Sequence, residues 1–260
     1  MISEKTIASE QAFFDQEAVA LKDEELRIAE RIFDRYRRAR PGALNAPKDE
    51  LFARLLPLDG KEILDYGCGH GENACLLAAC GARVSGFDLS PLSIATATRR
   101  AEINGLSHLT RFDVRRATET GYAPASFDHV LGFGILHHLH MILPAVYEEV
   151  ARLVKPGGTA CFLEPVANSA TLRFLRRVTP VKLDVTEDER QLTDADLELM
   201  RPHFDSLELR YYHGLRRLHR VMGSWSVRGL TWADQNLQRI APLVRRYYGM
   251  VLVIARAPGG

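Results

Sequence analysis

Short apolar runs alternate with longer amphipathic segments through the middle of the chain. The apolar runs have the length of strands, and the clearest are EILDY at 62–66, RVSGFD at 83–88, FDHVLGF at 127–133 and TACFLEP at 159–165. Between them, apolar residues recur at helical spacing, as in PLSIATATRRAEING at 91–105. Strands separated by helices predict βαβ units, in which helices cover both faces of a parallel sheet.

The two ends of the chain show other patterns. Apolar residues at helical spacing predict one or two amphipathic helices over residues 10–40, before Pro41, Gly42 and Pro47 break the pattern. Beyond Pro165 the chain first looks irregular or partly helical, and LTDADLELMRPHF then predicts a helix that begins at Thr193 or Asp194. We expect one domain in three parts: an N-terminal helical cap (1–48), a core (49–165) and the remainder of the sheet (166–260), with strands at 206–212 and 250–257 and a cap insert at about 213–249.

Composition and charge give no reason to expect a nucleic-acid or membrane protein. Of the 260 residues, 46% are hydrophobic and 26% are charged, and the formal net charge is +1. The first residues lack the apolar core of a signal peptide, and no run reaches the roughly 18 apolar residues of a spanning helix. The four cysteines form no C-x-x-C pair. We therefore expect a cytoplasmic protein with reduced thiols and no transmembrane segment.

Three glycines at alternate positions follow the first strand, in ILDYGCGHGENACLLA at 63–78. Gly67, Gly69 and Gly71 let the backbone approach a ligand closely, and the following helix points its N-terminus at the same place. A tight turn without a ligand and a dinucleotide site are the alternatives. The spacing differs from the G-x-G-x-x-G of dinucleotide-binding proteins, which weakens the second alternative.

Two carboxylates accompany this loop. Asp65, two residues before Gly67, would help to receive an amino group but would repel a pyrophosphate. Asp88 closes the second strand, where a carboxylate can bind both hydroxyls of a ribose. Asp88 alone fits NAD equally well, so the two acids together are stronger evidence about the ligand than either acid by itself.

Five segments resemble, in order, the motifs of class I S-adenosylmethionine-dependent methyltransferases: LDYGCGHGENACLLA, VSGFDLSPLSIATA, FDVRRA, FDHVLGFGILHHL and LVKPGGTACFLEP. They are most similar to the branch that methylates small molecules such as quinones and other secondary metabolites. The resemblance covers 61–165 and implies an α/β, Rossmann-like, doubly wound sheet of seven strands with the last strand antiparallel and helical cap segments. It also implies S-adenosylmethionine as cofactor and S-adenosylhomocysteine as product.

The resemblance also implies which residues bind the cofactor. The glycine loop would form the floor of the site, Asp65 would order the loop and the ammonium group, and Asp88 would bind the ribose. Asp113 would accept from the adenine amine, although a turn-forming carboxylate is the alternative there. Tyr66 replaces a smaller aliphatic residue, and we expect its ring near the methionine end or the pocket floor. The full expected set is Asp65, Tyr66, Gly67, Cys68, Gly69, Gly71, Asp88, Leu89, Asp113, Val114, Phe133 and Gly134.

Two histidines follow the fourth strand, at the edge of the sheet where ligands of α/β proteins bind. Methyl transfer to a hydroxyl or amine needs a base, and histidine titrates near neutral pH. We therefore expect His138 first, then His137, to be catalytic, with Glu164 at the end of the fifth strand assisting. A capping or packing role is the alternative. Adjacent histidines rarely converge on one ion, so we expect no metal at His137, His138 and His140.

The insert at 213–249 carries seven arginines and one acid. Its apolar stripe of Leu215, Leu218, Val221, Met222 and Trp225 predicts a lid over the pocket with a solvated basic face. An anionic or lipid-tailed substrate, or attachment to a membrane surface, are the alternatives.

These features together favour O-methylation of a natural-product or quinone-like small molecule. Carbon or nitrogen acceptors stay open, because all three reactions share the cofactor site. An RNA or protein methyltransferase is less favoured, since no RNA-binding module and no N-P-P-Y-type tetrapeptide follows the fourth strand. A catalytically silent cofactor-binding protein is the third class. We expect no nucleic-acid partner, and a homodimer stays open.

Overall fold

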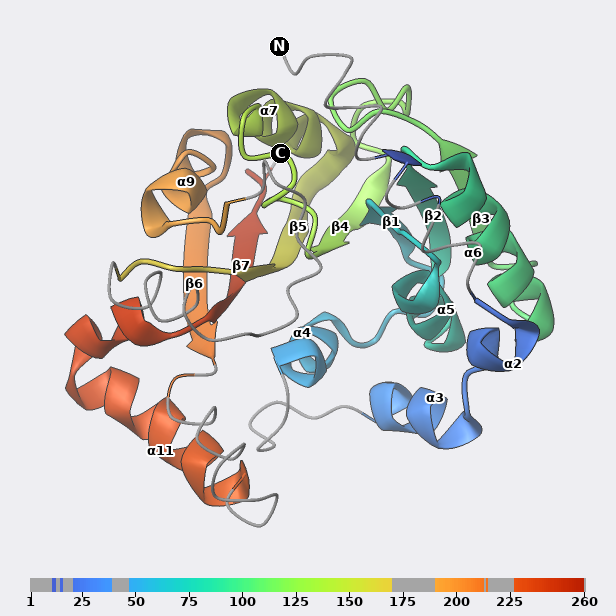
Figure 1. The fold of residues 1–260 in the computed structure, drawn as a ribbon. Coiled ribbons are helices and arrows are strands. Elements are labelled where there is room, and N and C mark those ends of the chain that lie inside the picture. The colour runs from blue at the N-terminus through green and yellow to red at the C-terminus, as the bar shows by residue number, and fades with distance from the viewer. Residues whose placement is uncertain are drawn as a thin grey trace.

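One mixed sheet of seven strands forms the centre of the computed structural model, which describes residues 11, 12, 15, 21–38, 47–169, 190–212, 214 and 227–259 (Figure 1). The strands are β1 Glu62–Tyr66, β2 Arg83–Asp88, β3 Thr110–Val114, β4 Phe127–Phe133, β5 Val154–Pro165, β6 Ser206–Tyr212 and β7 Met250–Arg256. Their order is β3-β2-β1-β4-β5-β7-β6, and β7 runs antiparallel to both of its neighbours while the remaining pairs are parallel. The predicted sheet, with its last strand antiparallel, is confirmed.

Helices cover both faces of the sheet because the central strands are apolar on both sides. Ile63 and Leu64 are adjacent in β1 and fully buried, yet they belong to different cores, as neighbouring residues of a strand must. Helices α7 (Leu143–Leu153) and α9 (Asp194–Glu198) contribute to the core on one face. Helices α3 (Glu30–Arg37), α4 (Pro47–Leu55) and α5 (Glu72–Ala79) contribute to the core on the other (Figure 1).

Helices α2 (Asp23–Leu26), α3 and α4 precede the first strand in the described chain. The expected helices within 10–40 are found as α2 and α3, and a further helix, α4, begins at Pro47. Proline suits the first residue of a helix because the N–H that it lacks has no partner there. The expected boundary between cap and core, after residue 48, falls inside α4.

The region after β5 differs from expectation in one helix. Thr193 is its N-cap, but α9 ends at Glu198, and a short 3-10 helix, η1, follows at Arg201–His203. Pro202 explains the early end, since its ring cannot continue an α-helix without losing a hydrogen bond. Between β6 and β7 lie α11 (Val227–Ile240) and a 3-10 helix, η4 (Pro242–Tyr247). The expected apolar stripe from Leu215 to Trp225 lies outside the described residues.

Helix α6 (Pro91–Ile103) begins shortly after β2 and fixes the position of the short connection between the two. The Ser90 hydroxyl accepts a hydrogen bond from the backbone N–H of Ser93 at 2.9 Å, and Pro91 occupies the first turn. Both are ordinary signals of a helix start. Because the parallel register aligns β1 with β2 and β4, the loops that leave these three strands meet at one edge of the sheet.

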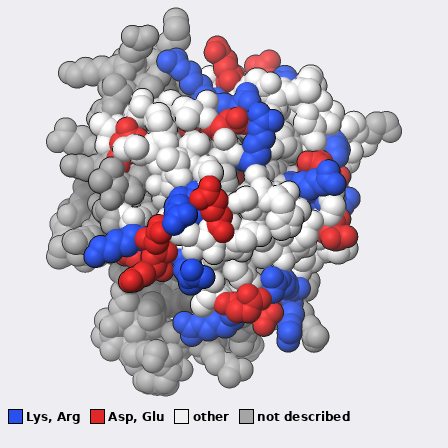
Figure 2. All heavy atoms as spheres, turned by 90° about the vertical axis from the view of Figure 1, so that its right-hand side faces the viewer, with Lys and Arg blue, Asp and Glu red and all other residues white. Residues whose placement is uncertain are grey.

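Charged side chains of both signs are interspersed on the face beside α2 and α6 (Figure 2). Arg99 and Asp23, for example, lie 2.6 Å apart there. This mixture fits the formal net charge of +1. Within the described ranges, no helix is long and apolar enough to cross a membrane.

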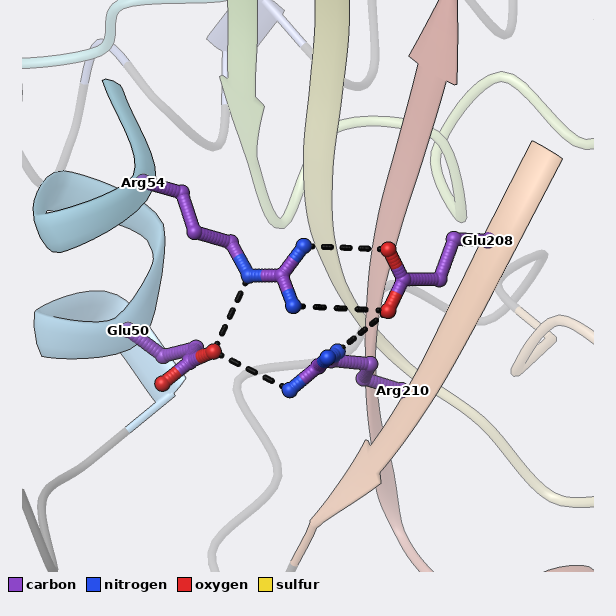
Figure 3. Close-up of polar contacts among 4 residues, drawn as sticks. All are labelled: Glu50, Arg54, Glu208 and Arg210. Atoms are coloured by element: carbon purple, nitrogen blue, oxygen red, sulfur yellow. Dashed lines mark hydrogen bonds and ion pairs between the residues drawn. The ribbon is translucent and has the colours of Figure 1, made fainter. Parts of the chain in front are cut away.

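Four charged side chains join α4 to the edge strand β6 (Figure 3). Arg54 lies 2.9 Å from Glu50 on its own helix and 3.0 Å from Glu208 on the strand. Arg210 lies 3.0 Å from Glu50 and also pairs with Glu208. The cluster closes a ring of alternating charges, so it holds α4 against the edge strand of the sheet.

Replacing Arg54 by Met should lower the free energy of unfolding by about 1 kcal/mol, because partly exposed ion pairs contribute up to about that much. The loss should shrink at high salt, which screens exposed charges. Urea unfolding at two salt concentrations measures both effects. Arg83→Met is the matched control, since Arg83 is mostly exposed and 4.0 Å from Glu62. A loss that salt leaves unchanged would show that packing of the Arg54 stem, and not its charge, matters.

Candidate functional site

A cavity of about 640 Å³ opens where β1, β2 and β4 end. Its walls come from the glycine loop, the start of the β2–α6 connection, the loop after β3 and the turn after β4. Eight predicted site residues line it: Gly67, Cys68, Gly69, Asp88, Leu89, Phe133, Gly134 and His138. Seven others do not: Asp65, Tyr66, Gly71, Asp113, Val114, His137 and Glu164.

The glycine loop is tightly packed at both ends and open in the middle. Gly67, Gly69 and Gly71 all have positive φ, at 70°, 47° and 73°. A Cβ on Gly67 would lie 2.6 Å from the side chain of Ile135, and one on Gly71 would lie 2.7 Å from Ala97. A Cβ on Gly69 would meet no atom within 4 Å. The open position is therefore where a ligand can approach the backbone.

Asp88 connects this loop to α6. Its Oδ2 accepts from the backbone N–H of Gly69, and its Oδ1 from that of Ser90, both at 3.0 Å. Burial raises the pKa of Asp88, although these two N–H donors oppose the rise. Each carboxylate oxygen has a second lone pair, so Asp88 can also accept hydrogen bonds from a ligand in the cavity.

Asp65 lies beneath the loop as a buried carboxyl group. Only 1% of the residue is exposed, and neither oxygen has a hydrogen-bond partner of normal geometry among the described residues. Burial raises the pKa of Asp65 to about 7, while the charge of Lys48 and, more weakly, the nearby backbone N–H of Ala74 act in the opposite direction. A buried polar group without a partner is costly, and a cationic ligand group nearby would remove that cost.

Lys48, at the start of α4, is a candidate that sequence reasoning missed. Its Nζ lies 5.6 Å from the ring centroid of Phe133, which lines the cavity, and 5.5 Å from that of Tyr36. It also lies 3.4 Å from Glu72. Burial lowers the pKa of Lys48, and the charge of Glu72 opposes this. The residue is 17 positions before Asp65, and no local pattern links the two.

Glu164 organises the turn after β4. The side chain is fully buried; its Oε1 accepts from the backbone N–H groups of Ile135 and Leu136, at 2.8 and 2.9 Å. Its Oε2 lies 2.9 Å from Nδ1 of His137. The rings of His137 and His138 are 4.2 Å apart, but only His138 lines the cavity. The three residues expected to be catalytic are thus together, with one of them facing the cavity.

The β3 side of the cavity differs from expectation. Asp113 Oδ2 lies 3.3 Å from both Arg111 and Arg115, and Val114 is about half exposed, at 51%. The following loop, residues 115–119, lines the cavity in their place. Neither Asp113 nor Val114 lines the cavity, and their role in cofactor binding stays a prediction.

A buried acid on α7 holds this loop. Glu149 accepts from the backbone N–H of Thr120 at 3.1 Å and pairs with Arg152 at 2.7 Å. The Tyr66 ring packs in the core 4.7 Å from Phe87, and its hydroxyl donates to the carbonyl of Ala117. Ala117 lines the cavity, so Tyr66 supports the wall without forming it.

The far end of the cavity is apolar. Ile135, Leu139, Ile142 and Ala145 line it, and His138 lies in the same stretch of chain. One cavity therefore combines a polar end at Asp88 with an apolar end beside a histidine. No group of three His, Cys, Asp or Glu residues in the described ranges has a geometry that could hold a metal ion.

Comparisons with known proteins show that part of the core is similar to methyltransferases. Residues 63–158 match a family model described as "Methyltransferase domain". A ubiquinone biosynthesis O-methyltransferase from Paracidovorax citrulli is 39% identical over 109 residues, which are 42% of this chain and 45% of that protein. The chain thus matches less than half the length of this curated relative.

Two solved structures show the same fold with different chemistry. The phosphoethanolamine N-methyltransferase 2 of Haemonchus contortus, in complex with phosphomonomethylethanolamine and S-adenosylhomocysteine, has a TM-score of 0.59 and 18% identity, over 96% of this chain and 60% of that one. The [4+2]-cyclase SpnF has a TM-score of 0.56 and 21% identity, over 89% and 82%. At such identities the likeness shows the fold alone, so the reaction must be argued from the site.

Gly71→Ala should destabilise the protein more than Gly69→Ala. Both substitutions place a side chain at positive φ, which costs about 1–2 kcal/mol. At Gly71 the new methyl group also meets Ala97, and such overpacking adds about 1–3 kcal/mol. Thermal unfolding of the two variants measures the difference. Equal losses would mean that α6 moves aside easily and does not fix the loop.

Proposed function

We propose that this chain, which carries the methyltransferase domain of the class I S-adenosylmethionine-dependent family, methylates an oxygen atom of a small molecule. The observation that carries the proposal is that one cavity joins the ligand-accepting carboxylate of Asp88 to His138 and an apolar end. A cofactor site and an acceptor site must adjoin in this way, because the methyl group passes directly between the two molecules.

The polar end fits S-adenosylmethionine. Asp88 would accept from the ribose hydroxyls, and Gly69 leaves the backbone open beside it. Asp65, buried without a partner of normal geometry in the described chain, suits the cationic amino group, and Lys48 suits the carboxylate. When bound, this cofactor supplies a methyl group activated by the positive sulfur to which it is attached.

The apolar end and His138 suit the acceptor. His138 would take the proton of the acceptor hydroxyl, which makes the oxygen a better nucleophile. His137 and Glu164 position it, since the same buried carboxylate holds both His137 and the turn. Residues such as Leu139 and Ile142 would contact an apolar ring or tail and exclude water from the reacting atoms.

Carbon or nitrogen acceptors are the alternative, because the cofactor end would be the same for them. The histidine could serve all three, because amine and carbon acceptors also lose a proton on methylation, but the similarity of the core to a ubiquinone biosynthesis O-methyltransferase favours oxygen. Incubation with S-adenosylmethionine labelled in the methyl group, followed by mass spectrometry of phenolic, enolic and amine acceptors, tests the proposal. Cofactor binding without transfer to any of them would point to a protein that uses the fold for other chemistry.

Cofactor binding near pH 7 should release protons from Asp65. A group whose pKa is about 7 is half protonated at that pH, and a neighbouring ammonium group favours its charged form. The heat of binding measured by calorimetry should therefore differ between phosphate and Tris buffers, and Asp65→Asn should remove the difference. Equal heats for the unmodified protein would place the ammonium group elsewhere.

The same ionisation sets a pH dependence of stability in the free protein. Because folding raises the pKa of Asp65, its contribution to stability is fully present below the ordinary pKa of 3.8 and is lost as pH rises through about 7.

His138→Ala should lower kcat by about 10²–10⁴-fold, the usual worth of general-base assistance, while the Kd for the cofactor stays nearly constant. His137→Ala should lower kcat less, because it acts through position. His108→Ala, on the exposed turn before β3, is the control and should be neutral. Normal turnover of both active-site variants would show that the acceptor binds already deprotonated.

A further inference from the structure

Helices α11 and η4, between β6 and β7, expose large apolar side chains on their outer side. The exposed fractions are 60% for Trp232, 82% for Ile240, 80% for Leu243 and 44% for Tyr247. Trp232 and Ile240 are eight positions apart, which places them about 80° apart around α11, on one side of the helix. We call these four residues, with Arg245 and Arg246, the α11–η4 face.

This face is basic as well as apolar. Residues 227–247 contain four arginines and a single acid, Asp234, whose side chain is buried at 4% exposure. Arg245 and Arg246 are exposed, and no ion pair within the described part of the chain engages them. The Arg246 guanidinium lies 5.0 Å from the ring centroid of Tyr247. The face thus carries positive charge without acidic neighbours of its own.

Two acids from other elements lie near these arginines, but both have partners. Arg245 and Arg246 line a surface hollow of about 470 Å³ together with Asp194 and Glu198. Asp194 accepts from the Tyr211 hydroxyl at 2.7 Å, and Glu198 pairs with Arg201 at 2.6 Å. The hollow thus holds three arginines, Arg201, Arg245 and Arg246, against two acids, so the acids offset only part of its positive charge. This contrasts with the mixed surface beside α2 and α6 (Figure 2).

A hydrogen bond ties α11 to the segment that leads into β7. The Tyr248 hydroxyl donates to the carbonyl of Asp234 at 2.8 Å, and both residues are buried. Tyr248 lies two residues before the first residue of β7, Met250. Trp232 and Ile240 thus lie on a helix that is tied to the chain just before β7, and Leu243 and Tyr247 lie in the short stretch between the two.

We propose that the α11–η4 face lies on the surface of an anionic lipid bilayer. Leu243 and Ile240 would enter the boundary between headgroups and acyl chains, Trp232 and Tyr247 would lie at headgroup level, and the arginines would meet lipid phosphates. A second copy of the chain fits less well. A two-fold contact would place the face against a second copy of itself, and the face as defined has two arginines and no acid to pair with them.

Vesicle flotation of the full chain tests the proposal. The protein should float with vesicles of phosphatidylcholine and phosphatidylglycerol but not with phosphatidylcholine alone, and high salt should release it. Arg245→Gln with Arg246→Gln should weaken binding about 25-fold, since each arginine near an anionic surface is worth about fivefold. Leu243→Ser with Trp232→Ser should also weaken it. Arg31→Gln with Arg38→Gln, on the exposed side of α3, is the matched control and should have no effect.

Three outcomes would overturn the proposal: equal binding to neutral and anionic vesicles, equal weakening by the control pair, or no vesicle binding. Gel filtration of the same variants identifies the alternative occupant. If Leu243→Ser with Trp232→Ser converts a dimer into a monomer and vesicles are not bound, the face is a contact between two copies of the chain. Circular dichroism of each variant confirms that it is folded.

Discussion

The carboxylate of Asp88 joins the pieces from which the cavity is built. One oxygen holds the glycine loop that leaves β1, and the other holds the first residues before α6. The strands themselves could pair without this contact, but the loop and the helix would not then be fixed against each other. Gly71 packs against α6 so closely that no side chain fits between them. The glycines are therefore needed both for backbone conformation and for the short distance between loop and helix.

Sequence reasoning was strongest where the constraint is local. Alternating strands and helices predicted the sheet, and the comparisons and the structure confirm it. The glycine spacing placed Gly67 and Gly69 at a cavity, because a backbone at positive φ next to a strand end can be recognised from a few residues. The antiparallel direction of β7 followed from the family resemblance and not from periodicity, which says nothing about strand direction.

The rest of the site depends on contacts that are distant in sequence. Lys48 lies near Phe133, which lines the cavity, although the two residues are far apart in sequence. Glu149, on α7, binds the backbone of Thr120, 29 positions earlier, and so holds the loop after β3. Asp113 shows the same limit of sequence reasoning at a residue that was predicted to bind the cofactor. The family resemblance implied a ligand contact for this residue near the end of β3, but two neighbouring arginines lie against its carboxylate. Which member of a loop faces a cavity is decided by such pairings, and a single sequence does not reveal them.

The position of β7 has a consequence for how the chain must fold. It is the last strand in the chain, yet it lies between β5 and β6 and pairs with both. During synthesis, β6 leaves the ribosome before the strand that connects it to the sheet exists. Until then β5 presents an open edge of unpaired backbone groups, the kind of surface on which chains aggregate. The sheet is completed only by inserting its final strand, so a nascent chain halted before residue 250 would keep that edge open and leave β6 without its partner strand.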